Sequence, residues 1–424
     1  SSTRSCPGPR RCRISAGFKN YVSPPTMKRW RVFDGYFQIC NNALFFIPVL
    51  LPIYLNRGFN MQQILFAETI FYITIFISEI PTGAIADLLG KKYSMSISSI
   101  GSAISCVLLY CTQTYIWLIL SQILFGVAMT LSSGADSAYL YNYLKDNGQH
   151  EKYSSYEGKS YSFSIFFATL TTALGGIVFK VFSEAAPFLF SSIFYFIAGI
   201  VALKLPEAKA ERKLNVKQHI IEYYIQIKQS LIIVYQNKKL LNLTLIYGIF
   251  FMYSQLNIWI NQIYLKNTGV SVALYGVIIA GLGIGSTFLS WNIGVIRNKI
   301  NSHTLIYISC LLLPVCLLFL GIIPAFYSFV FLLMLNIAKG VFFPVVKQEL
   351  NLEIPDKNRA TILSVQSSIG NIFFALFAPV FGKAIDNLKL NYVFMATALF
   401  ICLIFTWPLC NTKKYMVRKR AETS

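Results

Sequence analysis

The residues of this chain that could do chemistry are ionisable side chains in long apolar segments. Glu68, Asp136 and Lys339 lie inside such segments, and Asp34 and Glu79 lie closer to segment ends. If these segments cross a membrane, each internal charge costs several kcal/mol unless it is paired or faces water. Each of these residues is therefore a candidate for binding a ligand or a proton.

Glu68 has no basic neighbour in its own segment, which reads LFAETIFY around it. Because a carboxylate facing lipid is very unfavourable, we expect Glu68 to face the protein interior or an outer vestibule. Its role is then either reversible protonation or that of a hydrogen-bonded structural acid near the outer surface. Asp34 differs, since Lys28, Arg29 and Arg31 are close in sequence. For Asp34 we expect a solvated carboxylate that balances a helix dipole.

Lys339 lies in the segment MLNIAKGVFFP, together with Asn336. A buried lysine needs a counter-charge, which a protein acid or an anionic ligand can supply. Alternatively its ammonium extends to the nearby membrane surface, because Pro344 and Lys347 mark the inner end of the segment. Asn336 and Lys339 are therefore candidates for a ligand or proton pathway.

The composition is that of an integral membrane protein. Of 424 residues, 55% are hydrophobic and only 13% are charged, and the mean hydropathy is +0.56. The formal net charge is +20, but the charges gather in short loops between apolar runs. We therefore expect the lipid bilayer, and not nucleic acid, as the large partner of this chain.

Twelve apolar segments are long enough to cross a membrane as helices. They cover about 33–55, 62–85, 94–112, 114–142, 160–182, 185–204, 240–265, 271–295, 303–321, 324–350, 359–384 and 391–411. We expect an all-α protein with two six-helix bundles, 27–204 and 240–411, joined by a polar linker at 205–239. A β-barrel is excluded, because its strands would be about ten residues long and alternating.

Lys and Arg are concentrated in the loops on one side of these segments. With residues 27–32 inside, the outer loops and helix ends carry only Arg57, Lys180, Lys266, Lys383 and Lys389. This bias places both termini, the linker and the basic tail 412–424 in the cytoplasm. Residues 1–26 contain no acid, and we expect a disordered tail before a natural start at Met27. A transit peptide is the alternative for that tail.

The cysteines and histidines form no recognisable site. Nine cysteines show no C-x-x-C spacing, and most lie in apolar segments, where cysteine acts as a small hydrophobe. We expect no disulfide framework, no metal site and no cofactor. His150, His219 and His303 lie in loops or at their edge without suitable companions, which argues against a membrane-embedded enzyme. The sequence also lacks a Walker-type ATP loop and a repeated channel filter.

One loop carries a family resemblance. The stretch GAIADLLGKK, from Gly83 to Lys92, follows the second apolar segment and contains Asp87, Gly90 and Lys91. It resembles the loop between helices 2 and 3 in the major facilitator superfamily (MFS) of transporters. The resemblance implies that fold and gives Asp87 a gating role that holds the two halves together on the cytoplasmic side.

The gating group that we predict extends beyond this loop. Glu79 lies one turn before Gly83, and Asp136 follows the small residues of SSGADSAYLYNYL, where another helix can pack closely. The predicted gating residues are Gly83, Asp87, Gly90, Lys91, Lys92, Glu79 and Asp136. A weaker second copy, GVIRNKINSH, from Gly294 to His303, occupies the corresponding place in the second half.

Uncharged polar residues cluster on the first and seventh apolar segments. In the resembling fold, helices 1, 4, 7 and 10 line the central cavity. The candidates for the substrate or proton pathway are Gln38, Asn41, Asn42, Gln255, Asn257, Trp259, Asn261 and Gln366, besides Glu68, Asn336 and Lys339. Hydrogen bonds that hold the helices together are the alternative role for these amides.

Two superfamily patterns are degraded in this chain. Gln122 replaces an arginine that is linked to proton movement, and TTALGG has Thr171 and Thr172 in place of a Gly-Pro pair. Other segments, RATILSVQSSIGN and SGADSAYLYNYLK, look similar to those of bacterial efflux-type members.

We predict a secondary transporter that moves a small organic molecule by alternating access. Proton-coupled efflux from a bacterial cytoplasm, by a monomer in the inner membrane, is the favoured form. A proton-coupled or facilitative importer is the alternative. Lys339 would suit an anionic metabolite, whereas Glu68 would suit a cation or a proton.

Overall fold

The computed structural model describes residues 35–206, 216–323, 328–354 and 359–423. Its first half consists of η1 (Ile47–Val49), α2 (Leu50–Asn56), α3 (Met61–Leu89), α4 (Lys91–Cys111), α5 (Tyr115–Ser132), α6 (Ala135–Asp146), η2 (His150–Lys152), α7 (Tyr153–Val181) and α8 (Ala186–Leu203). The linking helix is α9 (Val216–Gln236). The second half consists of α10 (Lys238–Asn267), α11 (Val272–Trp291), α12 (Ile293–Lys299), α13 (Ser302–Ile322), α14 (Phe329–Glu353), α15 (Arg359–Asn387) and α16 (Leu390–Thr423).

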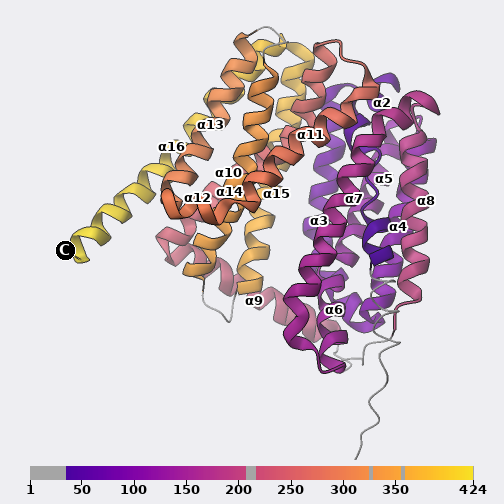
Figure 1. Ribbon diagram of the computed structural model, residues 1–424, viewed down its shortest axis with the longest axis horizontal. Helices are drawn as coiled ribbons and strands as arrows, with labels where there is room; N and C mark the ends of the chain where they lie inside the picture. The colour runs from indigo at the N-terminus through magenta and orange to yellow at the C-terminus, as the bar shows by residue number, and fades with distance from the viewer. Residues whose placement is uncertain (1–34, 207–215, 324–327, 355–358, 424) are drawn as a thin grey trace, which may run out of the picture.

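The predicted all-α membrane fold is confirmed. In the described part, 11 helical stretches are long and apolar enough to cross a membrane, and Ile47–Asn56 is a shorter apolar helix. Figure 1 shows the helices up to α8 and those from α10 onward as two bundles side by side. The basic segment 412–424, expected as a tail, continues α16 as far as Thr423.

The first predicted span, 33–55, is not one continuous helix. The described chain is helical over residues 35–41 and leaves the helix before η1 begins at Ile47. Pro48 lies in the first turn of η1, a position where a proline suits the start of a new helix. Side chains of the same bundle take up the freed backbone donors. The N–H of Leu44 donates to Thr171 Oγ1 over 2.9 Å, and that of Phe45 donates to Ser191 Oγ over 3.2 Å.

The predicted span 114–142 also divides, into α5 and α6. Gly134 lies between them with φ of 73°, a left-handed conformation that glycine adopts readily. Asp136 therefore lies in the first turn of α6 and not in the last turns of a single helix. An acid at a helix N-terminus is stabilised by the helix dipole.

The two helical bundles meet more closely at one end of their long axes than at the other. We name these ends the Arg57 end, where residues 57–60 join α2 to α3, and the Gly90 end, where Gly90 joins α3 to α4. At the Arg57 end, α7 packs on α11 and the start of α3 packs on the end of α15, and the contact of α3 with α15 continues as far as Glu79 and Ser364. At the Gly90 end, α6 packs on α4, α5 and α7 of its own half, and α12 packs on α11 and α14 of the other.

Glycines allow the helices α7 and α11 to touch through their backbones. A Cβ atom added to Gly176 would lie 2.5 Å from the carbonyl oxygen of Val272. One added to Gly276 would lie 2.2 Å from the carbonyl oxygen of Thr172. Such small-residue contacts are how transmembrane helices associate, since lipid supplies no hydrophobic driving force between them.

The substitution Gly276→Ala should therefore destabilise the protein. The added methyl group forces α7 and α11 apart, at a cost of about 1–3 kcal/mol for overpacking. Thermal unfolding of the purified protein in detergent should show a lower midpoint. Gly281→Ala on the same helix is the matched control, because an added Cβ meets nothing within 4 Å there. Equal midpoints for the two variants would contradict the proposed close contact.

Candidate functional site

A cavity of about 490 Å³ lies between the two halves. Its lining comes mainly from the broken first segment, α3 and α5 on one side, with Leu109 of α4 and Tyr195 of α8, and from α10 and α15 on the other. It extends from Leu50 and Tyr54, near the Arg57 end, to Ser133, an exposed residue toward the Gly90 end. The volume is typical of sites that bind small organic molecules.

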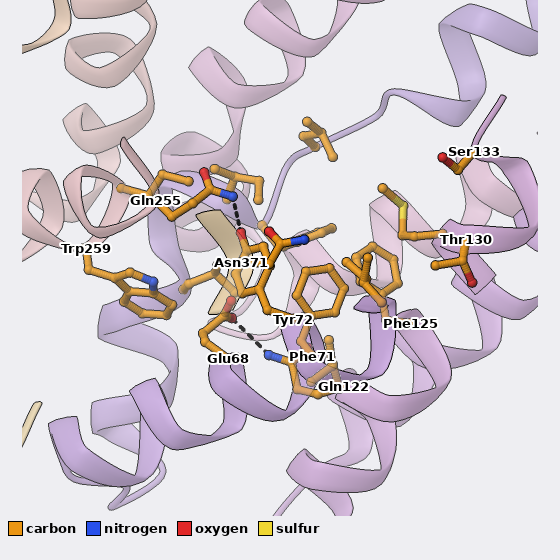
Figure 2. Close-up of a pocket in the computed structure, with 18 of the residues that line it drawn as sticks. Glu68, Phe71, Tyr72, Gln122, Phe125, Thr130, Ser133, Gln255, Trp259 and Asn371 are labelled. Carbon is orange, nitrogen blue, oxygen red and sulfur yellow. Dashed lines mark hydrogen bonds between the residues drawn. The ribbon is translucent and has the colours of Figure 1, made fainter. Parts of the chain in front are cut away.

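Glu68 lies on α3 and lines this cavity. Its Oε1 accepts a hydrogen bond of 2.9 Å from Nε2 of Gln122 on α5. In Figure 2 the carboxylate lies near Tyr72 and Phe71 of its own helix. A carboxylate in such surroundings needs a proton or a counter-ion, because burial without either is costly.

A second polar contact in the cavity joins the two halves. Gln255 on α10 donates through Nε2 to the hydroxyl of Tyr72 on α3, as the dashed line in Figure 2 shows. The Tyr72 ring also packs edge-on against Phe374 of α15, with ring centroids 4.7 Å apart. Tyr72 therefore contacts two helices of the other half at once.

Two further residues of the second half complete the central part of the lining. They are Trp259 on α10 and Asn371 on α15. Within the described part of the chain, the buried Oδ1 of Asn371 has no hydrogen-bond partner. Buried polar atoms are nearly always hydrogen-bonded, so this oxygen is an exception in the wall of the cavity.

Glu79 also lines the cavity, about three turns along α3 from Glu68. Its Oε1 accepts a hydrogen bond of 2.9 Å from Ser364 Oγ on α15, so Glu79 connects the halves. Among the described residues that line the cavity, none is Lys, Arg or His. The lining therefore carries two acids without a basic partner.

The amides predicted on the first segment lie outside this lining. Gln38 Oε1 accepts from Ser164 Oγ of α7 over 2.9 Å, and Asn41 Oδ1 accepts from Ser99 Oγ of α4 over 2.8 Å. Asn42 donates to the carbonyl of Gln38 over 2.8 Å. The bonds to Ser164 and Ser99 connect the first segment to helices of its own half, and the bond of Asn42 lies within the segment. A substrate contact by these residues stays a prediction.

The predicted residues of the second half divide in the same way. Gln255 and Trp259 line the cavity, whereas Asn257, Asn261, Asn336 and Gln366 are buried outside its lining. Asn257 donates to Asn336 Oδ1 over 3.2 Å, and Gln366 donates to Thr244 Oγ1 over 3.3 Å. Lys339 is half-buried on α14, and it too lies outside the cavity lining.

The predicted gating residues lie toward the Gly90 end. Asp87 and Lys91 form an ion pair of 3.3 Å, and Gly90 between them has φ of 90°. The ammonium of Lys92 lies 5.7 Å from the ring centre of Tyr93, and an added Cβ on Gly83 would meet nothing within 4 Å. Asp136 Oδ1 accepts from the N–H of Ser137 over 2.7 Å. Their gating role stays a prediction.

A cross-half contact at the Arg57 end was not predicted. Asp386, at the end of α15, accepts from the backbone N–H groups of Met61 and Gln62 over 2.9 and 2.8 Å. These are the first two residues of α3, whose third N–H is capped by Asn60. Gly382 permits this approach, because a Cβ there would lie 2.7 Å from the Met61 carbonyl oxygen.

The sequence did contain a signal for this contact. Asp386 is unfavourable for the dipole of its own helix, because α15 ends one residue later. An acid in that position suits the N-terminus of another helix. Gln262 adds a parallel link, since it accepts from the N–H of Leu51 over 2.9 Å and donates to the Ile47 carbonyl over 3.1 Å.

Two helical bundles with a cavity between them are the architecture of a membrane transporter. A family model described as Major Facilitator Superfamily matches residues 35–378. The chain therefore belongs to the Major Facilitator Superfamily.

Individual relatives agree with this assignment. The MFS-type transporter YxaM of Bacillus subtilis (strain 168) is 23% identical over 369 residues, which cover 84% of this chain and 89% of that protein. Among solved structures, the nucleoside transporter NupG matches with a TM-score of 0.71 at 14% identity, covering 91% of this chain and 98% of that one. A D-xylose-proton symporter matches with a TM-score of 0.67 at 13% identity, covering 89% and 96%. At such identities the two structures show the fold alone.

Substitution of Asp386 should loosen the N-terminus of α3. Asp386→Ala removes two hydrogen bonds to a charged acceptor, each worth about 1.5–3 kcal/mol. Hydrogen exchange of the amides of Met61 and Gln62, followed by mass spectrometry, should become faster by about tenfold or more. Asn387→Ala is the control, since its side chain bonds only to the Lys383 carbonyl of its own helix. Unchanged exchange in Asp386→Ala would show that the carboxylate does not hold this helix end.

Proposed function

We propose that this protein is a secondary transporter that exports a small organic molecule across the bacterial plasma membrane in exchange for protons. The observation that carries the proposal is the cavity between the halves, with Glu68 in its wall and close contacts at the Arg57 end. Alternating access requires a central site that opens to one side at a time. The basic loops of the Gly90 end support a cytoplasmic position for that end. In that orientation the cavity faces the cytoplasm.

Glu68 is the residue that we propose for proton coupling. It is a carboxylate in an aromatic wall, it accepts a hydrogen bond from the neutral amide of Gln122, and none of the described residues that line the cavity is basic. Binding of a proton relieves the cost of a charge in this position, and release to water restores the carboxylate. When the site then opens to the other side of the membrane, the proton bound to Glu68 is carried across.

Support for Glu79 in this role is weaker. Its carboxylate already accepts from Ser364 in the other half, so it belongs to a contact that changes when the halves rotate. We propose Glu79, together with Asp87 and Lys91, as a group that responds to closure at the Gly90 end. Lys91 and Asp87 lie four residues apart, and a surface pair of this kind contributes little to stability by itself.

The export direction is tested in inside-out vesicles, where the cytoplasmic face is outside. A proton gradient that is acid inside should drive uptake of the accepted substrates from a panel of metabolites and drugs. Dissipation of the gradient with an uncoupler should abolish the accumulation. Accumulation driven only by the opposite gradient would identify an importer, and flux that is independent of any gradient would contradict proton coupling.

Glu68→Gln should remove gradient-driven accumulation while the folded protein is retained. The substitution keeps the shape and a hydrogen-bonding partner for Gln122, but the amide cannot take up the proton. We expect a loss of about tenfold or more in accumulation. The control is Glu184→Gln, an exposed acid that accepts from Asn56 at the Arg57 end. Full coupled transport by Glu68→Gln would exclude Glu68 as the proton site.

A further inference from the structure

We infer that the substrate is an organic cation with an aromatic or similarly apolar body, held by Glu68 and the aromatic wall of the cavity. This inference rests on the proposed transport function and adds the charge and shape of the molecule carried. The sequence left the sign of that charge open, because Lys339 suits an anion and Glu68 suits a cation. The placement of these two residues decides between them.

The charges around the cavity favour a cation. Glu68 and Glu79 line it, and no described lining residue is basic. Arg57 lies outside the lining, and its guanidinium donates to the carbonyls of Leu109 and Tyr110 over 2.6 and 3.2 Å. Lys339 lies outside the lining. An anion in this cavity would meet like charges without a compensating base.

The aromatic wall provides a second attraction for a cation. Figure 2 shows the indole of Trp259 on one side of Glu68, with Tyr72 and Phe71 on the other. Phe71 stacks on Phe125 with ring centroids 5.8 Å apart, so this side of the wall is a continuous aromatic surface. Ring faces attract cations, most strongly when water is excluded, and the same rings contact the apolar body of a ligand.

Hydrogen-bond acceptors are available for a charged amine. A carboxylate can accept about four hydrogen bonds, and Gln122 supplies one to Glu68. Asn371 lines the same cavity from the other half, although its Oδ1 is buried in this conformation. A protonated amine in the cavity could therefore donate to the Glu68 carboxylate beside the bond from Gln122.

A pair of ions with the same shape and opposite charge tests this inference. Tetraphenylphosphonium and tetraphenylborate both carry four phenyl groups, so a binding difference reports the sign of the charge. Equilibrium dialysis with the purified full chain in detergent, corrected with protein-free micelles, should give at least about tenfold tighter binding of the phosphonium ion. Equal binding, or tighter binding of the borate, would overturn the inference.

Two substitutions and one control test where the phosphonium ion binds. Glu68→Gln should weaken phosphonium binding by about tenfold or more, and Glu184→Gln should leave it unchanged. Phe125→Leu should weaken binding of the phosphonium ion while the carboxylate is retained. If Glu68→Gln does not fold, the wild-type comparison of the two ions still tests the sign. A phosphonium preference that persists in folded Glu68→Gln would overturn the assignment to this site.

The cation inference and the proposed transport function can fail independently of each other. Gradient-driven transport of other compounds, without a preference for the phosphonium ion, would overturn the cation inference and leave the transport function intact. Glu68-dependent phosphonium binding without gradient-driven transport of any panel compound would support the cation site and contradict proton-coupled transport.

Discussion

The structure depends on the contact between the two halves at the Arg57 end. There α7 and α11 touch through glycines, and the carboxylate of Asp386 binds the first two amides of α3. Hydrophobic burial does not drive helix association within lipid, so close backbone packing and hydrogen bonds must hold these helices. Because the halves meet closely at this end, the cavity can widen toward the other. Each contact is small, which suits a joint that must open.

The break in the first segment belongs to the same arrangement. The regular helix ends at residue 41, and Thr171 and Ser191 accept the hydrogen bonds of the Leu44 and Phe45 amides that follow the break. Gly175 allows this, since a Cβ there would lie 2.0 Å from the Phe45 carbonyl oxygen. The irregular backbone is thus bound within the first half, and Leu44, Phe46 and Ile47 reach the cavity wall. Irregular backbone is tolerated at membrane depth where protein or a cavity surrounds it.

Much of the fold could be predicted from the sequence, because apolar segments long enough to span a membrane are a strong physical signal. The GAIADLLGKK loop also indicated the family, which the family model confirms. The interruptions were missed, since a window of apolar residues does not register how Pro48 or Gly134 changes the backbone. Residue type alone also could not place the side chains. The rotation of a helix decides whether an amide meets a cavity or a neighbouring helix, so Gln38 binds Ser164 while Gln255 reaches the cavity.

The candidate site shows the same division between what a sequence indicates and what packing decides. Glu68 and Lys339 were equally visible as charges within apolar segments, but only Glu68 lines the cavity. Asp386 was not singled out from the sequence, although an acid at the end of α15 is unfavourable for its own helix and suits the N-terminus of another. Its partner is more than 300 residues away in the chain, and no local pattern relates the two.

The most direct test of this account measures distances across both ends of the protein. Spin labels at Ser183 and Lys389 would report the Arg57 end, and labels at Lys145 and Lys299 the Gly90 end, in a background with the native cysteines replaced. All four positions are exposed. Asp386→Ala should lengthen the first distance and shorten the second, because loss of the contact at one end lets the halves close at the other. If both distances stay unchanged, or both change in the same direction, the Arg57-end contact does not control access to the cavity.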